Sequence, residues 1–272
     1  MRLGGFIFDR PTDPVELARL HVRLGYRAAY CPPVKLEDAQ RIKELRSAFE
    51  KEDVVIAEVG GWCNLLARDE AKRRKNFQYV CEQLALADEI GARCCVDFIG
   101  THDPNSEWGP DPGNLTDETF DLTVEIVRRI VDDVKPRHAK FALEMMSWTI
   151  PDSVDSYLKL LAAVDRPSFA AHIDPVNLIV SPRLYFNNGA LIRDCFERLG
   201  RWIVSCHAKD IRLRNEAVVH LYEVRPGLGA LDYRTYLRHV SALDLPLMLE
   251  HLASAEEYGA ARDYLANLAK EV

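Results

Sequence analysis

The stretch that decides the fold runs from residue 140 to residue 174 and reads KFALEMMSWTIPDSVDSYLKLLAAVDRPSFAAHID. It holds two short apolar segments, 140–146 and 169–174, on either side of a longer amphipathic segment at 152–164. Short apolar runs bounded by turn residues predict buried strands, and the amphipathic segment between them predicts a helix. The stretch is therefore a predicted strand–helix–strand unit of a parallel sheet.

The same alternation continues along the whole chain. We expect strands at about 2–8, 27–31, 54–59, 92–98, 140–146, 169–174, 203–208 and 246–251. Helices are expected at about 13–24, 36–51, 69–90, 117–135, 152–164, 184–199, 232–243 and 255–270. The strands are apolar on both faces, which is typical of parallel strands covered by helices. Eight such units without a break in composition predict an α/β fold, a single (β/α)8 TIM barrel forming one domain over residues 1–272. An open, doubly wound sheet is the alternative.

Composition and charge narrow the classes of function. The chain has 35 Lys and Arg against 42 Asp and Glu, a net charge of −7, and this acidic balance argues against nucleic acid as a partner. The seven cysteines are odd in number and form no CxxC pair, so we expect a reducing, cytoplasmic setting. Neither a secretory signal nor a membrane-length apolar stretch is recognised. The balance suits an enzyme with a small-molecule substrate, and whether it forms a homo-oligomer is left open.

Four polar residues lie at the ends of four consecutive predicted strands: Glu144, Asp174, His207 and Glu250. Their spacings are 30, 33 and 43 residues, which correspond to one strand–helix unit each and, for the last, a unit with a long loop. Neighbouring strands lie roughly 4.8 Å apart, so inward-pointing side chains on four neighbours can meet at one cation. An open sheet would give no reason for these residues to share one end.

Three carboxylates and one imidazole are an oxygen-rich ligand set. That set favours Mn²⁺ or Mg²⁺ over a structural zinc site, with Zn²⁺ and Co²⁺ left open. Buried carboxylates without a cation would repel one another. Each residue taken alone is more often a cap, a surface charge or a core histidine. Their common register on successive strands favours a site for one divalent metal ion.

The motifs around these residues resemble a known family. ALE at 142–144, HIDPVN at 172–177, CHAKD at 206–210 and MLEH at 248–251 are similar to those of the sugar phosphate isomerase/epimerase family. These proteins are xylose-isomerase-like TIM barrels and include ketose 3-epimerases, hydroxypyruvate isomerase and inosose dehydratase. The likeness covers essentially the whole chain, and GLGALDY at 227–233 resembles the family's substrate-side loop.

The resemblance implies separate roles for the four residues. Glu144, Asp174, His207 and Glu250 would hold the metal, and Glu144 and Glu250 would also act as acid and base on opposite sides of the substrate. The ketose 3-epimerases carry a substrate-binding His three residues after the metal Asp. This chain has Asn177 at that position, so the resemblance does not carry that contact or that sugar preference over to it.

Several further residues are candidates for contact with the substrate. His172 and Lys209 each lie two residues from a predicted ligand, so strand alternation points them the same way, toward substrate or in support of the metal. Glu58, near the end of the predicted strand 54–59, would either reach the open carboxyl end of the barrel or form a structural salt bridge. Two long loops, 99–116 and 209–231, follow strands, where barrel enzymes place their active sites. His102 and Trp108 in the first would form a lid or pack the loop. The arginines of the second, Arg212, Arg214 and Arg225, would bind an anionic group or lie solvated.

These residues predict proton abstraction next to a carbonyl. A metal ion that binds the carbonyl oxygen and a neighbouring hydroxyl stabilises an enediolate, and a glutamate removes the proton. We therefore expect a metal-dependent isomerase or epimerase of a ketose, sugar acid or related carbohydrate. A dehydratase using the same site is the main alternative. DNA cleavage, known for barrels of this type, is disfavoured by the eight histidines and the acidic charge, and a non-catalytic binding protein is disfavoured by the paired glutamates.

Overall fold

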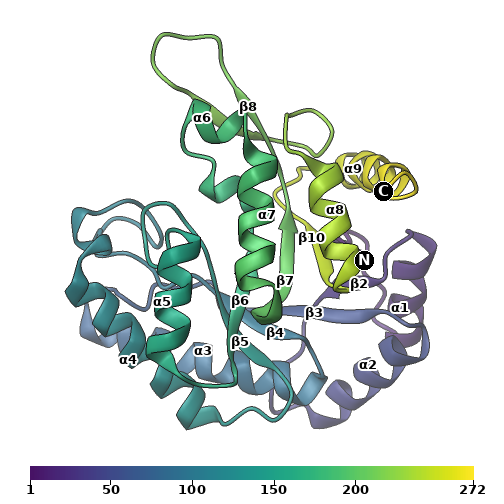
Figure 1. Cartoon of the computed structure of the whole chain (residues 1–272). Helices are drawn as coiled ribbons and strands as arrows, with labels where there is room; N and C mark the ends of the chain where they lie inside the picture. The colour runs from purple at the N-terminus through teal and green to yellow at the C-terminus, as the bar shows by residue number, and fades with distance from the viewer.

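The computed structural model describes residues 1–272 and shows a closed barrel of eight parallel strands. Around the ring the strand order is β1-β10-β7-β6-β5-β4-β3-β2 (Figure 1). The barrel strands are β1 (Arg2–Gly4), β2 (Ala28–Tyr30), β3 (Val55–Gly60), β4 (Cys94–Asp97), β5 (Lys140–Glu144), β6 (Phe169–Ile173), β7 (Ile203–Ala208) and β10 (Pro246–Leu249). Every predicted strand is present, and the predicted single (β/α)8 barrel is confirmed.

The helices lie between the strands and cover the barrel. They are α1 (Pro14–Arg23), α2 (Ala39–Lys51), α3 (Glu70–Ile90), α4 (Asp117–Val134), α5 (Val154–Val164), α6 (Pro182–Tyr185), α7 (Asn188–Leu199), α8 (Tyr233–Ala242) and α9 (Ala255–Leu268). One cluster of 62 buried apolar residues joins strands and helices into a common core. None of the helices is both long and apolar enough to cross a lipid bilayer.

Side-chain caps explain where several helices begin. Asp13 accepts a hydrogen bond from the backbone N–H of Glu16, and Thr116 does the same for Thr119. Ser153 caps α5 through the N–H of Ser156. Such caps satisfy backbone donors that the first helical turn leaves free. The turn residues of the sequence therefore fix the helix starts within one or two positions.

Two segments differ from the prediction. The expected helix at 184–199 is divided into α6 and α7, because Ser181 caps a short first turn that ends before Asn187. The loop at 209–231 contains an antiparallel hairpin of β8 (Asp210–Leu213) and β9 (Leu221–Val224). Figure 1 shows this hairpin extending away from the barrel. The loop at 99–116 holds only the short 3-10 turn η1 (Pro112–Leu115).

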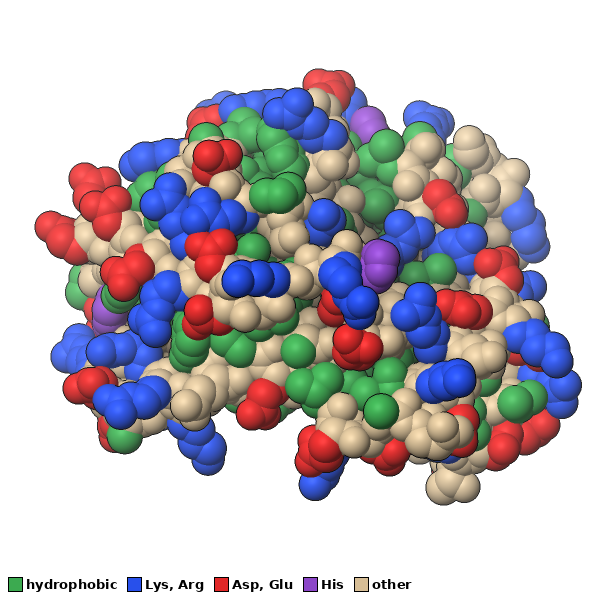
Figure 2. Space-filling view, turned by 90° about the horizontal axis from the view of Figure 1, so that it is seen from below, with side chains coloured by type: hydrophobic (Ala, Val, Ile, Leu, Met, Phe, Trp, Pro, Cys, Tyr) green, Lys and Arg blue, Asp and Glu red, His purple; other side chains and the backbone are tan.

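The barrel closes where its first strand meets its last. β1 pairs with β10 in parallel register from Arg2 with Pro246 to Gly4 with Met248. Arg2 is also paired with Asp53, just before β3, at 2.9 Å and with Asp244, just before β10, at 3.1 Å. Outside the barrel, the face seen in Figure 2 carries Lys and Arg interspersed with Asp and Glu.

Candidate metal centre

The four predicted ligands meet at the carboxyl end of the barrel. Glu144 is the last residue of β5, Asp174 follows β6, His207 lies on β7 and Glu250 follows β10. One ligand atom from each lies within 4.8 Å of those of the others. Asp174 and His207 have no exposed surface and Glu144 is 3% exposed. The structure thus brings together the set that the strand spacing predicts.

The imidazole of His207 connects this set to a second, deeper one. Its Nδ1 lies 3.2 Å from Glu144 Oε1 and 2.9 Å from Glu250 Oε1. Its Nε2 lies 3.1 Å from Oε2 of Glu58, which projects from β3 on the other side of the barrel. One ring nitrogen therefore faces the predicted ligands and the other faces a single buried carboxylate.

Glu58 is the centre of the deeper set. Its Oε1 lies 3.3 Å from His172 Nε2 and accepts a hydrogen bond from the Ser205 hydroxyl, and all of these side chains are buried. Burial alone would raise the pKa of Glu58, but the imidazoles of His207 and His172 outweigh it and lower that pKa to about 2. Glu58 is thus a carboxylate, which its neighbours hold in place.

Lys209 supplies a positive charge on the predicted-ligand side. Its Nζ lies 3.0 Å from Asp174 Oδ2 and 2.5 Å from Glu250 Oε1, and it donates to Asn177 Oδ1 at 3.4 Å. Asn177 in turn donates to Glu144 Oε1 at 3.1 Å. Both residues, predicted as substrate contacts, therefore touch the predicted ligands directly.

The residues present fit a divalent cation. Four carboxylates surround two basic groups, His207 and Lys209, so the cluster has spare negative charge. Asp174 Oδ2 and Glu250 Oε1 are buried and, although ion-paired with Lys209, make no hydrogen bond of good geometry. Burial raises the pKa of Asp174, and the nearby Glu144 and Glu250 raise it further against the effect of Lys209. A bound cation would relieve both the repulsion and the missing hydrogen bonds.

The candidate substrate contacts in the loop 99–116 form no hydrogen bond with the predicted ligands. His102 Nε2 lies 2.9 Å from the hydroxyl of Thr119, and its backbone N–H donates to Asn114, so the ring takes part in packing its loop. Trp108 is 51% exposed and packs on Trp148 with ring centroids 5.6 Å apart.

Arg225 is turned toward a helix of the barrel. Its guanidinium pairs with Glu257 at 3.0 Å, at the start of α9. The roles of His102, Trp108 and Arg225 in substrate binding stay predictions.

Two buried aspartates were not singled out from the sequence, and both order loops at the mouth. Asp97, the last residue of β4, accepts from the backbone N–H of Cys63 at 3.0 Å and of Phe98 at 2.9 Å. Asp210 accepts from four backbone N–H groups: those of Ile211, Gly227, Gly229 and Leu231. A Cβ on Gly229 would lie 2.2 Å from Asp210 Oδ1, so this glycine is required for the loop to wrap around the carboxylate.

Two contributors to the mouth also escaped notice, although the sequence carries a signal for each. Ser205 lies two residues before His207, so strand alternation turns it inward as well. Trp62 follows two glycines directly after β3, a pattern typical of a tight turn that presents a large side chain.

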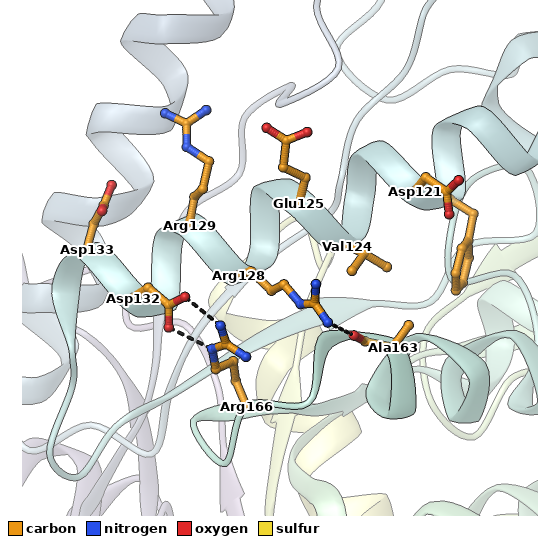
Figure 3. Close-up of a pocket in the computed structure, with 10 residues that line it drawn as sticks. Asp121, Val124, Glu125, Arg128, Arg129, Asp132, Asp133, Ala163 and Arg166 are labelled. Carbon is orange, nitrogen blue, oxygen red and sulfur yellow. Dashed lines mark hydrogen bonds and ion pairs between the residues drawn. The ribbon is translucent and has the colours of Figure 1, made fainter.

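A separate groove lies on the outside of the barrel, between α4 and the end of α5 (Figure 3). Three of its charged side chains are paired within the molecule. Arg166 makes two hydrogen bonds of 2.7 Å to Asp132, and Arg128 donates to the carbonyl of Ala163 at 2.6 Å. No group of its side chains converges as the predicted ligands do at the barrel mouth.

Three solved structures show how widely this fold is used. 3-Keto-D-glucoside 4-epimerase YcjR from E. coli matches with a TM-score of 0.69 and 13% identity over 99% of both chains. The probable 3-DHS dehydratase AsbF from Bacillus anthracis matches with 0.71 and 16% over 98% of both. Endonuclease IV from Thermus thermophilus matches with 0.73 and 12% over 100% of both. Identities this low show the shared fold alone.

A family model supplies the closer relationship. No curated protein matches the sequence. The model described as xylose isomerase-like TIM barrel matches residues 19–268, which includes every strand from β2 to β10 and all of the predicted ligands. This match agrees with the closed eight-stranded barrel and with the acidic cluster at its carboxyl end. The chain belongs to the xylose isomerase-like TIM barrel family.

Proposed function

We propose that the protein is a divalent-metal-dependent isomerase or epimerase of a ketose, sugar acid or related carbohydrate. The observation that carries the proposal is the convergence of Glu144, Asp174, His207 and Glu250 within 4.8 Å at the barrel mouth. The oxygen-rich donor set favours Mn²⁺, with Mg²⁺, Co²⁺ and Zn²⁺ as alternatives. The epimerase among the structural neighbours supports a carbohydrate substrate.

The four residues would divide two tasks. Asp174 and His207, fully buried, would mainly hold the ion, which when bound supplies a Lewis acid for a carbonyl and its neighbouring hydroxyl. Glu144 and Glu250 approach His207 Nδ1 from β5 and from the end of β10. Burial raises the pKa of each glutamate, but His207 lowers it more, so both are ionised and able to accept a proton.

The product depends on where the proton returns. One glutamate removes the proton next to the carbonyl and leaves an enediolate. The other glutamate, once it has taken up a proton from solvent, delivers that proton to the opposite face of the same carbon, which inverts that centre and is epimerisation. Delivery to the former carbonyl carbon moves the carbonyl along the chain, which is isomerisation. Lys209 and Asn177, which touch Glu250 and Glu144, would orient the hydroxyl groups of the substrate.

A dehydratase is the second candidate, and Lys209 is the observation that favours it. Loss of a hydroxyl group β to the carbonyl requires a proton donor for the leaving oxygen, and the Lys209 ammonium lies inside the cluster, 3.0 Å from Asp174. The dehydratase among the structural neighbours agrees with this reaction on the same fold. Mass spectrometry separates the two candidates, because only a dehydratase yields a product lighter by one water.

The test is exchange of substrate C–H protons with deuterated water, followed by NMR over a panel of ketoses and keto-acids. We expect exchange by the Mn²⁺-loaded protein, and its loss after EDTA treatment or in Glu144→Gln and Glu250→Gln variants. Glu50→Gln on α2, at a carboxylate whose side chain is 65% exposed, is the matched control and should exchange normally. Full-rate exchange by the EDTA-treated protein or by either active-site variant would contradict the proposal.

A further inference from the structure

The loop after β3 presents an exposed indole beside the candidate metal centre. It begins with Gly61-Trp62 directly after Gly60, the last residue of β3, and it leaves the barrel at the carboxyl end, where the four predicted ligands lie. Trp62 is 42% exposed, whereas the residues on either side of it are less exposed. Phe98, the aromatic side chain that it packs against, is only 7% exposed, so the indole is the open member of this pair.

The loop is built so that the indole can take this position. A Cβ on Gly60 would lie 2.2 Å from Nε1 of Trp62 and 2.4 Å from its Cδ1, so only glycine lets the ring fold back over the strand end. The N–H of Gly61 donates to the Val96 carbonyl at 2.7 Å, and Asp97 binds the N–H of Cys63. Both sides of Trp62 are thereby tied to β4.

The backbone of Trp62 is itself unusual. Its φ is +31°, in a region that bulky L-residues rarely adopt. Residues held in such conformations persist only where the surroundings impose them, and they concentrate at functional sites. In this loop, the surroundings are the two glycines and the β4 anchors, which together fix the direction of the indole.

The indole lies next to the imidazole that joins the two buried sets. The ring centroid of Trp62 is 6.2 Å from that of His207, and 6.0 Å from that of Phe98 on the other side. His207 has no exposed surface and Trp62 keeps 42% of its own. The mouth therefore offers a polar cluster and, beside it, an open aromatic face.

These two surfaces suit the two kinds of surface on a carbohydrate. Hydroxyl and carbonyl oxygens suit carboxylates, a lysine and a cation, whereas the C–H faces of the carbon chain are apolar and stack on aromatic rings. We propose that Trp62 is a substrate-positioning residue that stacks on the carbons beyond the reacting ones. The site then selects ketoses of five or six carbons over three-carbon analogues. This inference rests on the proposed function for the place of the reacting carbons.

The test compares ligand binding by the Mg²⁺-loaded protein and its variants, with D-fructose, D-xylulose and dihydroxyacetone as probes. Saturation-transfer NMR measures the Kd for each. Trp62→Leu removes the aromatic face but keeps an apolar side chain. We expect it to raise the Kd for D-fructose and D-xylulose by about tenfold. Binding of dihydroxyacetone should stay within about twofold, and Trp62→Phe should retain most of the affinity. Trp202→Phe, in the turn before β7, is the control and should change nothing.

Several outcomes would overturn the inference. One is a Trp62→Leu variant that binds D-fructose as tightly as the wild type does. A second is an increase in the Kd for dihydroxyacetone as large as that for the longer ketoses. A third is a wild-type protein that binds neither D-fructose nor D-xylulose. Mn²⁺ affinity, followed by the EPR signal of the free ion, should be unchanged in Trp62→Leu, and its loss would mean that Trp62 only supports the cluster. Failure of the proposed function is seen separately, as proton exchange that does not depend on Glu144 or Glu250. Proton exchange is thus scored independently of the role of Trp62.

Discussion

The carboxyl ends of β4 and β6 each carry a buried aspartate, but the two side chains have very different neighbours. Asp97 and Asp174 both stand where a strand ends, both are fully buried, and both accept a backbone N–H from the turn that follows. The second oxygen of Asp97 has only the Cys63 thiol nearby, at 4.0 Å. The second oxygen of Asp174 faces Lys209 and belongs to a set of four ligand candidates. A buried strand-end carboxylate is thus a site only where neighbouring strands bring further donors to it.

Substitution of Asp174 should have the largest effect on metal binding. We expect Asp174→Asn to lower Mn²⁺ affinity by more than about 100-fold, since it removes a ligand and not merely a supporting group, whose loss costs roughly 10–100-fold. The amide would also direct N–H groups at Lys209, which lies 3.0 Å away. Mn²⁺ titration followed by EPR measures the effect. Affinity within a few-fold of the wild type would remove Asp174 from the proposed ligand set.

Glu58 should have the next largest effect, although it is no proposed ligand. Its carboxylate accepts from His207 Nε2 at 3.1 Å and so leaves Nδ1 directed at Glu144 and Glu250. We expect Glu58→Gln to weaken Mn²⁺ binding by about 10–100-fold, because the orientation and basicity of the imidazole are lost. The same EPR titration measures it. Circular dichroism melting is needed alongside, since unaltered affinity in a folded variant would leave Glu58 with a packing role alone.

Asp97 should affect stability and not metal binding. Asp97→Ala leaves the buried N–H groups of Cys63 and Phe98 without an acceptor, so the free energy of unfolding should fall by about 1–3 kcal/mol. Asp97→Asn retains one acceptor oxygen, so its free energy of unfolding should fall by less. Urea denaturation gives the stability, and Mn²⁺ affinity should stay within a few-fold in both variants. A large loss of Mn²⁺ affinity in Asp97→Asn would contradict the assignment of Asp97 to stability and of Asp174 to metal binding.

The smallest effect concerns a buried histidine on the outer helix α1, which contacts none of the predicted ligands. His21 on α1 is 5% exposed and donates Nδ1–H to the Leu17 carbonyl, and burial lowers its pKa below 6.5. The unfolded chain therefore binds a proton at higher pH than the folded one, so this contribution to stability is complete above about pH 6.5 and declines as the pH falls below it. Urea midpoints between pH 5 and 8 should show a shallower slope in His21→Gln than in the wild type. Equal slopes would contradict the assignment.

The sequence predicts those parts of the molecule that depend on local pattern. Strand positions, helix positions and the four predicted ligands follow from apolar runs, amphipathic segments and the regular spacing of Glu144, Asp174 and His207. The deeper set around Glu58 could not be predicted, because it depends on the register of β3, β6 and β7 across the barrel. Similarly, the hairpin of β8 and β9 lies in a loop whose pairing the local pattern does not specify, and the position of Trp62 depends on a positive φ that its residue type disfavours.

The packed pair of Trp108 and Trp148 joins two loops that leave different strands. The indole N–H of Trp148 donates to the Trp108 carbonyl at 2.5 Å, and Asn114 of the first loop donates to the Trp148 carbonyl at 3.1 Å. A displacement of the loop after β4 must therefore carry the loop after β5 with it or break all of these contacts at once. We therefore expect the two loops to open as one unit, and the frequency of that opening would limit how often a ligand passes between them.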